Sequence, residues 1–171
     1  MRTVPAVAIW SLLLMQGGAQ ARPARFIPAP PPAWNVVLTG RAAKRVFNQC
    51  SRAAPTQVSG YWTPLASDIK PLETEAPAFF SSQKDKPDLP WNKYARQYAG
   101  YVQGGRRMIY VNCAPLEGVE QDDRDMKAAR GKGLDWRHTA FVVCDGGPQF
   151  FGMEYDVAAH QFRNLSFNGP G

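Results

Sequence analysis

A thiol, several carboxylates and a pair of glycines lie within the thirteen residues CDGGPQFFGMEYD, from Cys144 to Asp156. The chemistry that these residue types suggest first is nucleophilic attack by a Cys144 thiolate, with His138 or His160 as the base and Asp145 orienting the imidazole. Such a site needs an imidazole within hydrogen-bond reach of the sulfur and surroundings that favour the thiolate. The carboxylates of the same stretch offer a second chemistry, acid–base hydrolysis.

The strand pattern around the stretch favours a structural interpretation. Cys144 alternates with Val142 and Ala140, which places the thiol on the apolar face of a predicted strand. Asp145-Gly146-Gly147-Pro148 has the composition of a tight bend. A buried or disulfide-bonded Cys144 is therefore the expectation, with catalysis the alternative.

The following strand gives its two carboxylates an equally plain role. Phe151, Met153 and Tyr155 form one apolar row, so Glu154 and Asp156 fall on the opposite, solvent-facing side. Paired carboxylates arise often by chance on such a face, and glycoside chemistry needs a defined separation across a cleft.

Metal and cofactor chemistry has little support. The chain has two histidines, neither within a paired ligand motif, and the acidic run EQDDRD lacks the glycine and the distant glutamate of a calcium loop. There is no phosphate loop or dinucleotide fingerprint. We expect no metal and no cofactor.

The chain has three cysteines, so at least one thiol lies outside any intramolecular disulfide. Cys113 and Cys144 fall near the ends of predicted strands on either side of one long connection. Since those strands could be neighbours, a Cys113–Cys144 disulfide is the expected pairing, with Cys50 free.

The N-terminus predicts export. Residues 1–21 read as a signal peptide with a positive start, a short apolar run and an Ala-x-Ala end, which leaves no transmembrane anchor after cleavage. Residues 22–35 form a Pro-rich leader, and residues 36–171 a single α+β domain. Cleavage removes one Arg and lowers the net charge from +6 to +5. Because Lys and Arg are scattered, we expect no nucleic-acid partner. The signal peptide predicts a periplasmic or secreted location.

Hydrophobic periodicity orders the domain as helices followed by strands. Helices are predicted at 38–50, with Thr39 as N-cap, and at 64–81, kinked or segmented by Pro71 and Pro77. Strands are predicted at 94–103, 106–113, 139–145, 150–157 and 161–168, with a short charged helix at 119–130 in the long connection and Gly104-Gly105 as a hairpin turn. The fold class is α+β, with N-terminal helices packed on a meandering antiparallel sheet of four to five strands.

Aromatic and guanidinium groups of the outward strand faces are the best candidates for binding, since Tyr, Trp and Arg are enriched in recognition surfaces. With the predicted bend, the candidate binding residues are Tyr98, Tyr101, Arg106, Arg107, Tyr110, Trp136, Asp145, Gly146 and Gly147.

Two resemblances add to this. The stretches YWTPLASDIKPLE, YARQYAGYV with GGRRMIYVN, and DWRHTAFVVCDGGPQFFGMEYDVAAHQFRNLSFNG resemble a family of small exported bacterial proteins. That resemblance covers roughly residues 60–169 and implies a bacterial envelope or secreted setting, without an activity or site. The element order is also similar to the cystatin-like architecture, a helix packed across an antiparallel sheet. Residues 97–100 and 57–60 are incomplete versions of its Gln-x-Val-x-Gly hairpin, and Pro90-Trp91 precedes the first of them.

Together these observations predict an exported, non-enzymatic module that binds a protein or small molecule in the cell envelope, as an inhibitor or accessory factor of an envelope enzyme. The alternative is an envelope hydrolase that uses Cys144 or the carboxylates Asp145, Glu154 and Asp156.

Overall fold

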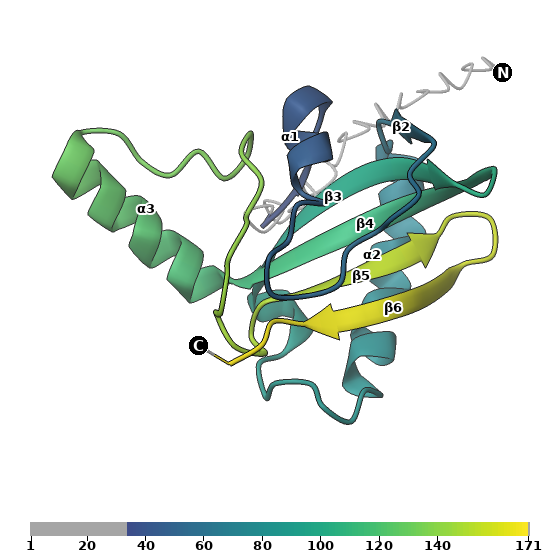
Figure 1. Ribbon diagram of the computed structural model, residues 1–171. Helices are drawn as coiled ribbons and strands as arrows, with labels where there is room; N and C mark the ends of the chain where they lie inside the picture. The colour runs from purple at the N-terminus through teal and green to yellow at the C-terminus, as the bar shows by residue number, and fades with distance from the viewer. Residues whose placement is uncertain (1–33, 171) are drawn as a thin grey trace, which may run out of the picture. The chain divides into compact units, whose positions relative to one another are not determined.

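A mixed sheet of six strands forms the centre of the computed structural model, which describes residues 34–170 (Figure 1). The predicted signal peptide and nearly all of the Pro-rich leader lie outside the described residues. The main path of the sheet runs β1-β3-β4-β5-β6, and β2 also pairs with β3. The strands are β1 (Asn35–Val37), β2 (Gly60–Trp62), β3 (Tyr94–Gln103), β4 (Arg106–Pro115), β5 (Phe151–Asp156) and β6 (Gln161–Phe167). β1 is parallel to β3, and every other pair is antiparallel.

The β3–β4 hairpin confirms the strongest local prediction. Gly104 and Gly105 have φ values of 56° and 75°, the left-handed conformation that a two-residue hairpin turn with matching twist requires. The register runs from Gln103 opposite Arg106 to Tyr94 opposite Pro115. Because β5 joins β4 only from Met108 onward, the turn extends beyond the neighbouring strand.

The predicted strand at 139–145 is wrong, and the described residues between β4 and β5 form α3 (Leu116–Arg130) followed by irregular chain. α3 confirms the expected charged helix, and Gly131 ends it in the left-handed conformation at φ 68°. Residues 136–150 then cross the sheet as an irregular segment, called the strap below. The sheet gains its extra strands from the N-terminal region instead, as the short β1 and β2.

The two N-terminal helices are α1 (Gly40–Arg45) and α2 (Ala66–Ser81). α1 is shorter than predicted, although Thr39 is its N-cap residue as expected. α2 continues through Pro71 and Pro77 as one helix rather than as separate segments. Neither proline is buried, so the helix carbonyls that lose a backbone donor at these positions lie toward solvent.

Both faces of the sheet are buried, and this corrects the prediction of a solvent-facing side. α2 covers one face through Ile69, Leu72 and Phe80, which pack with the odd-numbered residues of β4 and β5. The other face carries two further clusters, with residues of α1 and of the strap packed against Tyr101, Tyr110 and Ala114 among others. The result is an α+β fold with three α-helices in the described range. Within residues 34–170, no helix is long and apolar enough to span a bilayer.

Candidate functional site

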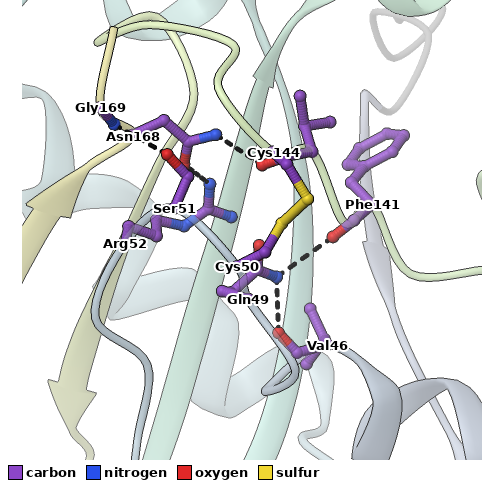
Figure 2. Close-up of a disulfide and its surroundings, with 10 residues drawn as sticks. Val46, Gln49, Cys50, Ser51, Arg52, Phe141, Cys144, Asn168 and Gly169 are labelled. Atoms are coloured by element: carbon purple, nitrogen blue, oxygen red, sulfur yellow. Dashed lines mark hydrogen bonds between the residues drawn. A yellow bond between two sulfur atoms is a disulfide. The ribbon is translucent and has the colours of Figure 1, made fainter. Parts of the chain in front are cut away.

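A disulfide joins Cys144 to Cys50, which corrects the predicted Cys113–Cys144 pairing (Figure 2). The two Cα atoms are 5.3 Å apart, within the range that the bond requires. Cys113 is a free, fully buried thiol on the α2 face of the sheet. Burial raises the pKa of this thiol far above its ordinary value, so Cys113 is protonated and inert at neutral pH. The prediction failed because Cys113 and Cys144 serve different faces of the sheet.

The cysteine–histidine site is excluded in this oxidised state. The Cys144 sulfur is bonded, and both imidazoles have carboxylate partners elsewhere: His138 Nδ1 is 2.7 Å from Asp135 Oδ1, and His160 Nδ1 is 3.0 Å from Glu75 Oε1. Asp145 lies in an exposed bend at φ 64°.

The carboxylates of β5 are buried, contrary to prediction, and both are occupied by the fold. The Tyr101 hydroxyl donates to Glu154 Oε2 at 2.7 Å, and Asn164 Nδ2 donates to Glu154 Oε1 at 3.0 Å. Burial, with this hydrogen bond adding, raises the pKa of the Tyr101 hydroxyl. Asp156 Oδ1 accepts from the backbone N–H groups of Ala158 and Ala159 at 3.1 and 3.0 Å, which closes the β5–β6 turn.

A buried polar network holds the strap on the sheet. Gln97 Nε2 donates to the carbonyls of Trp136 and Thr139 at 2.6 and 2.8 Å, and its Oε1 accepts from the Phe141 N–H at 2.8 Å. Asn112 Nδ2 donates to the Phe141 carbonyl at 3.1 Å.

The network extends to the chain around the disulfide. Arg52 donates to Asn112 Oδ1 and to Asn168 Oδ1. Asn168 Nδ2 in turn donates to the Val143 carbonyl at 2.7 Å, and Figure 2 shows Arg52 and Asn168 beside the disulfide. These polar groups are saturated by structural bonds, so we assign the whole network to fastening the strap rather than to chemistry.

Four of the nine residues predicted to bind lie inside the molecule. The aromatic candidates are at most 7% exposed: Tyr98, Tyr101, Tyr110 and Trp136. Gly146 is packed against Phe150 and Val143, and Gly147 sits in the same turn at φ 70°. The aromatic groups were expected to be exposed, but α2 covers Tyr98. Residues 46–58 and the strap cover the other sheet face, which the pattern had left open.

Two of the predicted binding residues, Arg106 and Arg107, project into solvent, and ion pairs hold their side chains in position. Arg106 Nη2 is 2.7 Å from Asp156 Oδ2, and Arg107 Nη2 is 3.4 Å from Asp68 Oδ1. The Arg107 guanidinium also lies over the Trp62 ring, 3.7 Å from its centroid. Each arginine side chain is 53% exposed, whereas its carboxylate partner is 3% or 14% exposed. The buried Asp156 and the partly buried Asp68 thus hold two exposed guanidinium groups in place.

Sequence reasoning missed the two apolar side chains beside these arginines. Tyr61 of β2 is 46% exposed and Leu65, the N-cap residue of α2, is 65% exposed. Tyr61 packs on the Phe47 ring with centroids 5.9 Å apart, and the ammonium of Lys44 lies 5.3 Å from the Tyr61 centroid. The run Gly60-Tyr61-Trp62 before Thr63-Pro64 was the available signal, but three residues are too few for a period to show a strand.

Six residues lie around this end of the sheet, and we call them the hairpin-end surface: Lys44, Tyr61, Trp62, Leu65, Arg106 and Arg107. Figure 1 shows β2 beside the turn of the β3–β4 hairpin.

Several hollows lie next to α3. One, of about 480 Å³, is lined mainly by charged residues of α3 and by Leu134 to Arg137 of the chain that returns from it. A second, of about 590 Å³, lies between the start of α3 and the segment around Pro90 and contains Leu89 and Leu116. Neither includes a residue of the hairpin-end surface.

No three His, Cys, Asp or Glu side chains among residues 34–170 are placed to hold a metal ion. Comparison of the chain with protein-family models, curated proteins and solved structures gives no match.

Proposed function

We propose that this protein is an exported, non-enzymatic binding module of the cell envelope that recognises a partner protein with its hairpin-end surface, as an inhibitor or accessory factor. The observation that carries the proposal is the combination of exposed Tyr61 and Leu65 with two arginines held by carboxylates of low exposure. Tyr and Arg dominate the binding energy of protein interfaces, and fixing them before binding lowers the entropy lost on association.

The remainder of the proposal rests on the pattern of the chain. The signal-peptide pattern supports export, and an exposed disulfide between Cys50 and Cys144 is compatible with an oxidising compartment. A cystatin-like arrangement is supported by α2 packing across the β3-β4-β5-β6 part of the sheet. In such an arrangement, hairpin ends are available for contact because the sheet faces are covered.

Affinity capture tests the proposal. The full chain is attached through its C-terminus, which follows the β6 end farthest from the hairpin turn, and exposed to an envelope extract of the producing organism. The test variant is Tyr61→Ser with Leu65→Ser; the control is Ala128→Ser with Ala129→Ser, at exposed positions of α3.

Truncating a binding hot spot costs about 2 kcal/mol or more. We therefore expect saturable capture of one protein by the wild type and the control, with affinity about 30-fold lower for the test variant. Equal capture by all three proteins would refute the role of this surface, and absence of any saturable partner would refute the function.

A further inference from the structure

The charges of the chain are segregated along its length. Residues 1–67 contain no Asp or Glu, and the described part of this range contributes Arg41, Lys44, Arg45 and Arg52. The first three lie on α1, where all are exposed. Within residues 34–170, none of the three has a carboxylate at ion-pair distance. α1 therefore presents three uncompensated positive charges.

This positive helix is continuous with the hairpin-end surface. Lys44 lies over Tyr61, and Arg41 shares the face of Lys44 because it is three residues earlier in the helix. The acids nearest to this end, Asp68 and Asp156, are already paired with Arg107 and Arg106. Their low exposure leaves little negative charge at the surface.

The shape of this end is that of a projection. The β3–β4 turn extends beyond β5, since Gln103 pairs with Arg106 whereas β5 reaches only Met108. β2 and the start of α2 lie beside it and expose Tyr61 and Leu65. A projecting glycine turn followed by two arginines, with exposed apolar side chains beside it, fits a concave partner better than a flat one.

We infer that the partner's binding site is an acidic concavity on a protein, lined by Asp and Glu. In this complex Tyr61 and Leu65 are buried as apolar anchors, while Arg106 and Arg107 pair with carboxylates through the free edges of their planar guanidinium groups. The cations of α1 remain at the border and accelerate association. The inference rests on the proposed function and specifies its partner.

An anionic membrane is the weaker occupant. Stable peripheral binding requires a sizeable apolar face in addition to positive charge, and this surface offers two exposed apolar side chains on a twisted edge. Nucleic acid is also weaker, because its binding rests mainly on phosphate contacts and would leave the apolar Leu65 side chain exposed.

The test uses defined probes and charge variants of the full chain. The extract is separated on an anion-exchange column into acidic and basic protein fractions, and phosphatidylglycerol–phosphatidylcholine vesicles and duplex DNA serve as further probes. The variant Arg41→Gln/Lys44→Gln/Arg45→Gln removes the charge of α1. The matched control Arg124→Gln/Lys127→Gln/Arg130→Gln removes three cations from α3.

We expect saturable binding to one protein of the acidic fraction. The α1 variant should associate with it about 10-fold more slowly at low salt, with the difference vanishing near 1 M salt, where the Debye length is about 3 Å. The α3 control should match the wild type.

The remaining outcomes separate the two proposals. A Tyr61-dependent partner that binds equally well at high salt overturns the acidic-cleft inference and leaves the proposed function standing. Binding to vesicles or DNA that depends on the same cations overturns the inference in favour of that occupant. No saturable protein in either fraction overturns both.

Discussion

Replacing the Cys50–Cys144 disulfide by two serines should remove a large part of the stability of the fold. The bond joins residues 94 positions apart, so it closes a loop that contains most of the described chain. By chain entropy, a cross-link that closes a loop of about 100 residues stabilises the native state by about 4.7 kcal/mol. Total unfolding free energies are about 5–15 kcal/mol, so the variant is expected to remain folded but only marginally stable.

The strap has other anchors, which is why the variant should keep its native structure. The hydrogen bonds of Gln97 and Asn112 to the strap backbone do not involve sulfur, and they are shielded from water. We therefore expect a loss of about 3–5 kcal/mol. The unfolding free energy should also fall more steeply with denaturant, because the unfolded chain without the cross-link is less compact and exposes more surface. For a domain of this size the corresponding fall in Tm is about 10 °C.

Urea unfolding followed by circular dichroism measures this loss, and alkylation with peptide mapping identifies the bond. Unreduced protein should yield a linked Cys50–Cys144 peptide and one thiol, that of Cys113, which is labelled only after unfolding. The variant Cys113→Ala serves as the control, because it removes that thiol and keeps the disulfide. A Cys113–Cys144 peptide, or a serine variant as stable as the wild type, would contradict the structure.

Three further predictions concern the core. Tyr94→Phe should be neutral or stabilising in urea unfolding, because the Tyr94 hydroxyl is buried without a partner in the described residues. Tyr101→Phe should cost about 1–3 kcal/mol, because the buried Glu154 carboxylate loses a hydrogen-bond donor. A larger loss for Tyr94→Phe than for Tyr101→Phe would be inconsistent with the structure. Gly152→Ala should cost about 1–3 kcal/mol in the same assay, because the new Cβ would lie 2.1 Å from the Tyr110 hydroxyl. Gly118→Ala, with nothing within 4 Å, should instead stabilise α3 by about 0.5–1 kcal/mol, and equal effects of the two changes would argue against the packing described. Finally, stability should fall as pH rises above about 10, by about 1.4 kcal/mol per pH unit for each tyrosine that stays protonated in the fold but ionises when unfolded. Burial raises the pKa of five of the six tyrosines: Tyr94, Tyr98, Tyr101, Tyr110 and Tyr155. The tyrosinate absorbance of these residues should therefore appear together with unfolding. Its full appearance in folded protein would refute their burial.

Features encoded by neighbouring residues could be predicted from the sequence. The glycine pair at 104 and 105 required a tight turn, and alternation in the strands on either side of it fixed their register. Gly131 similarly marked the end of α3. In each case the backbone conformation depends on residues within a few positions, so local pattern was sufficient.

The disulfide and the buried second face depended on contacts between distant segments. Glu154 and Asp156 alternate with core residues, a pattern typical of a half-exposed strand. They are buried because the chain around Arg52 and the strap close over that face. Apolar alternation in the strap resembled a strand, but its backbone bonds go to the Gln97 and Asn112 side chains.

The candidate site was predicted only in part, for the same reason. Arg106 and Arg107 follow directly from the hairpin turn, where side chains must project. Tyr61 and Leu65 belong to a short edge strand and a helix cap whose position beside the turn is set by pairing with β3. The hydrophobic periodicity of the sequence does not predict the pairing of β2 with β3.

Amide hydrogen exchange of the protein, alone and saturated with its captured partner, tests the central claim most directly. The hairpin-end surface predicts that binding slows exchange in residues 60–66 and 103–107, with α3 unchanged. Protection confined to α3 and residues 134–137, around the hollow of about 480 Å³, would show that the partner binds elsewhere and would contradict the assignment.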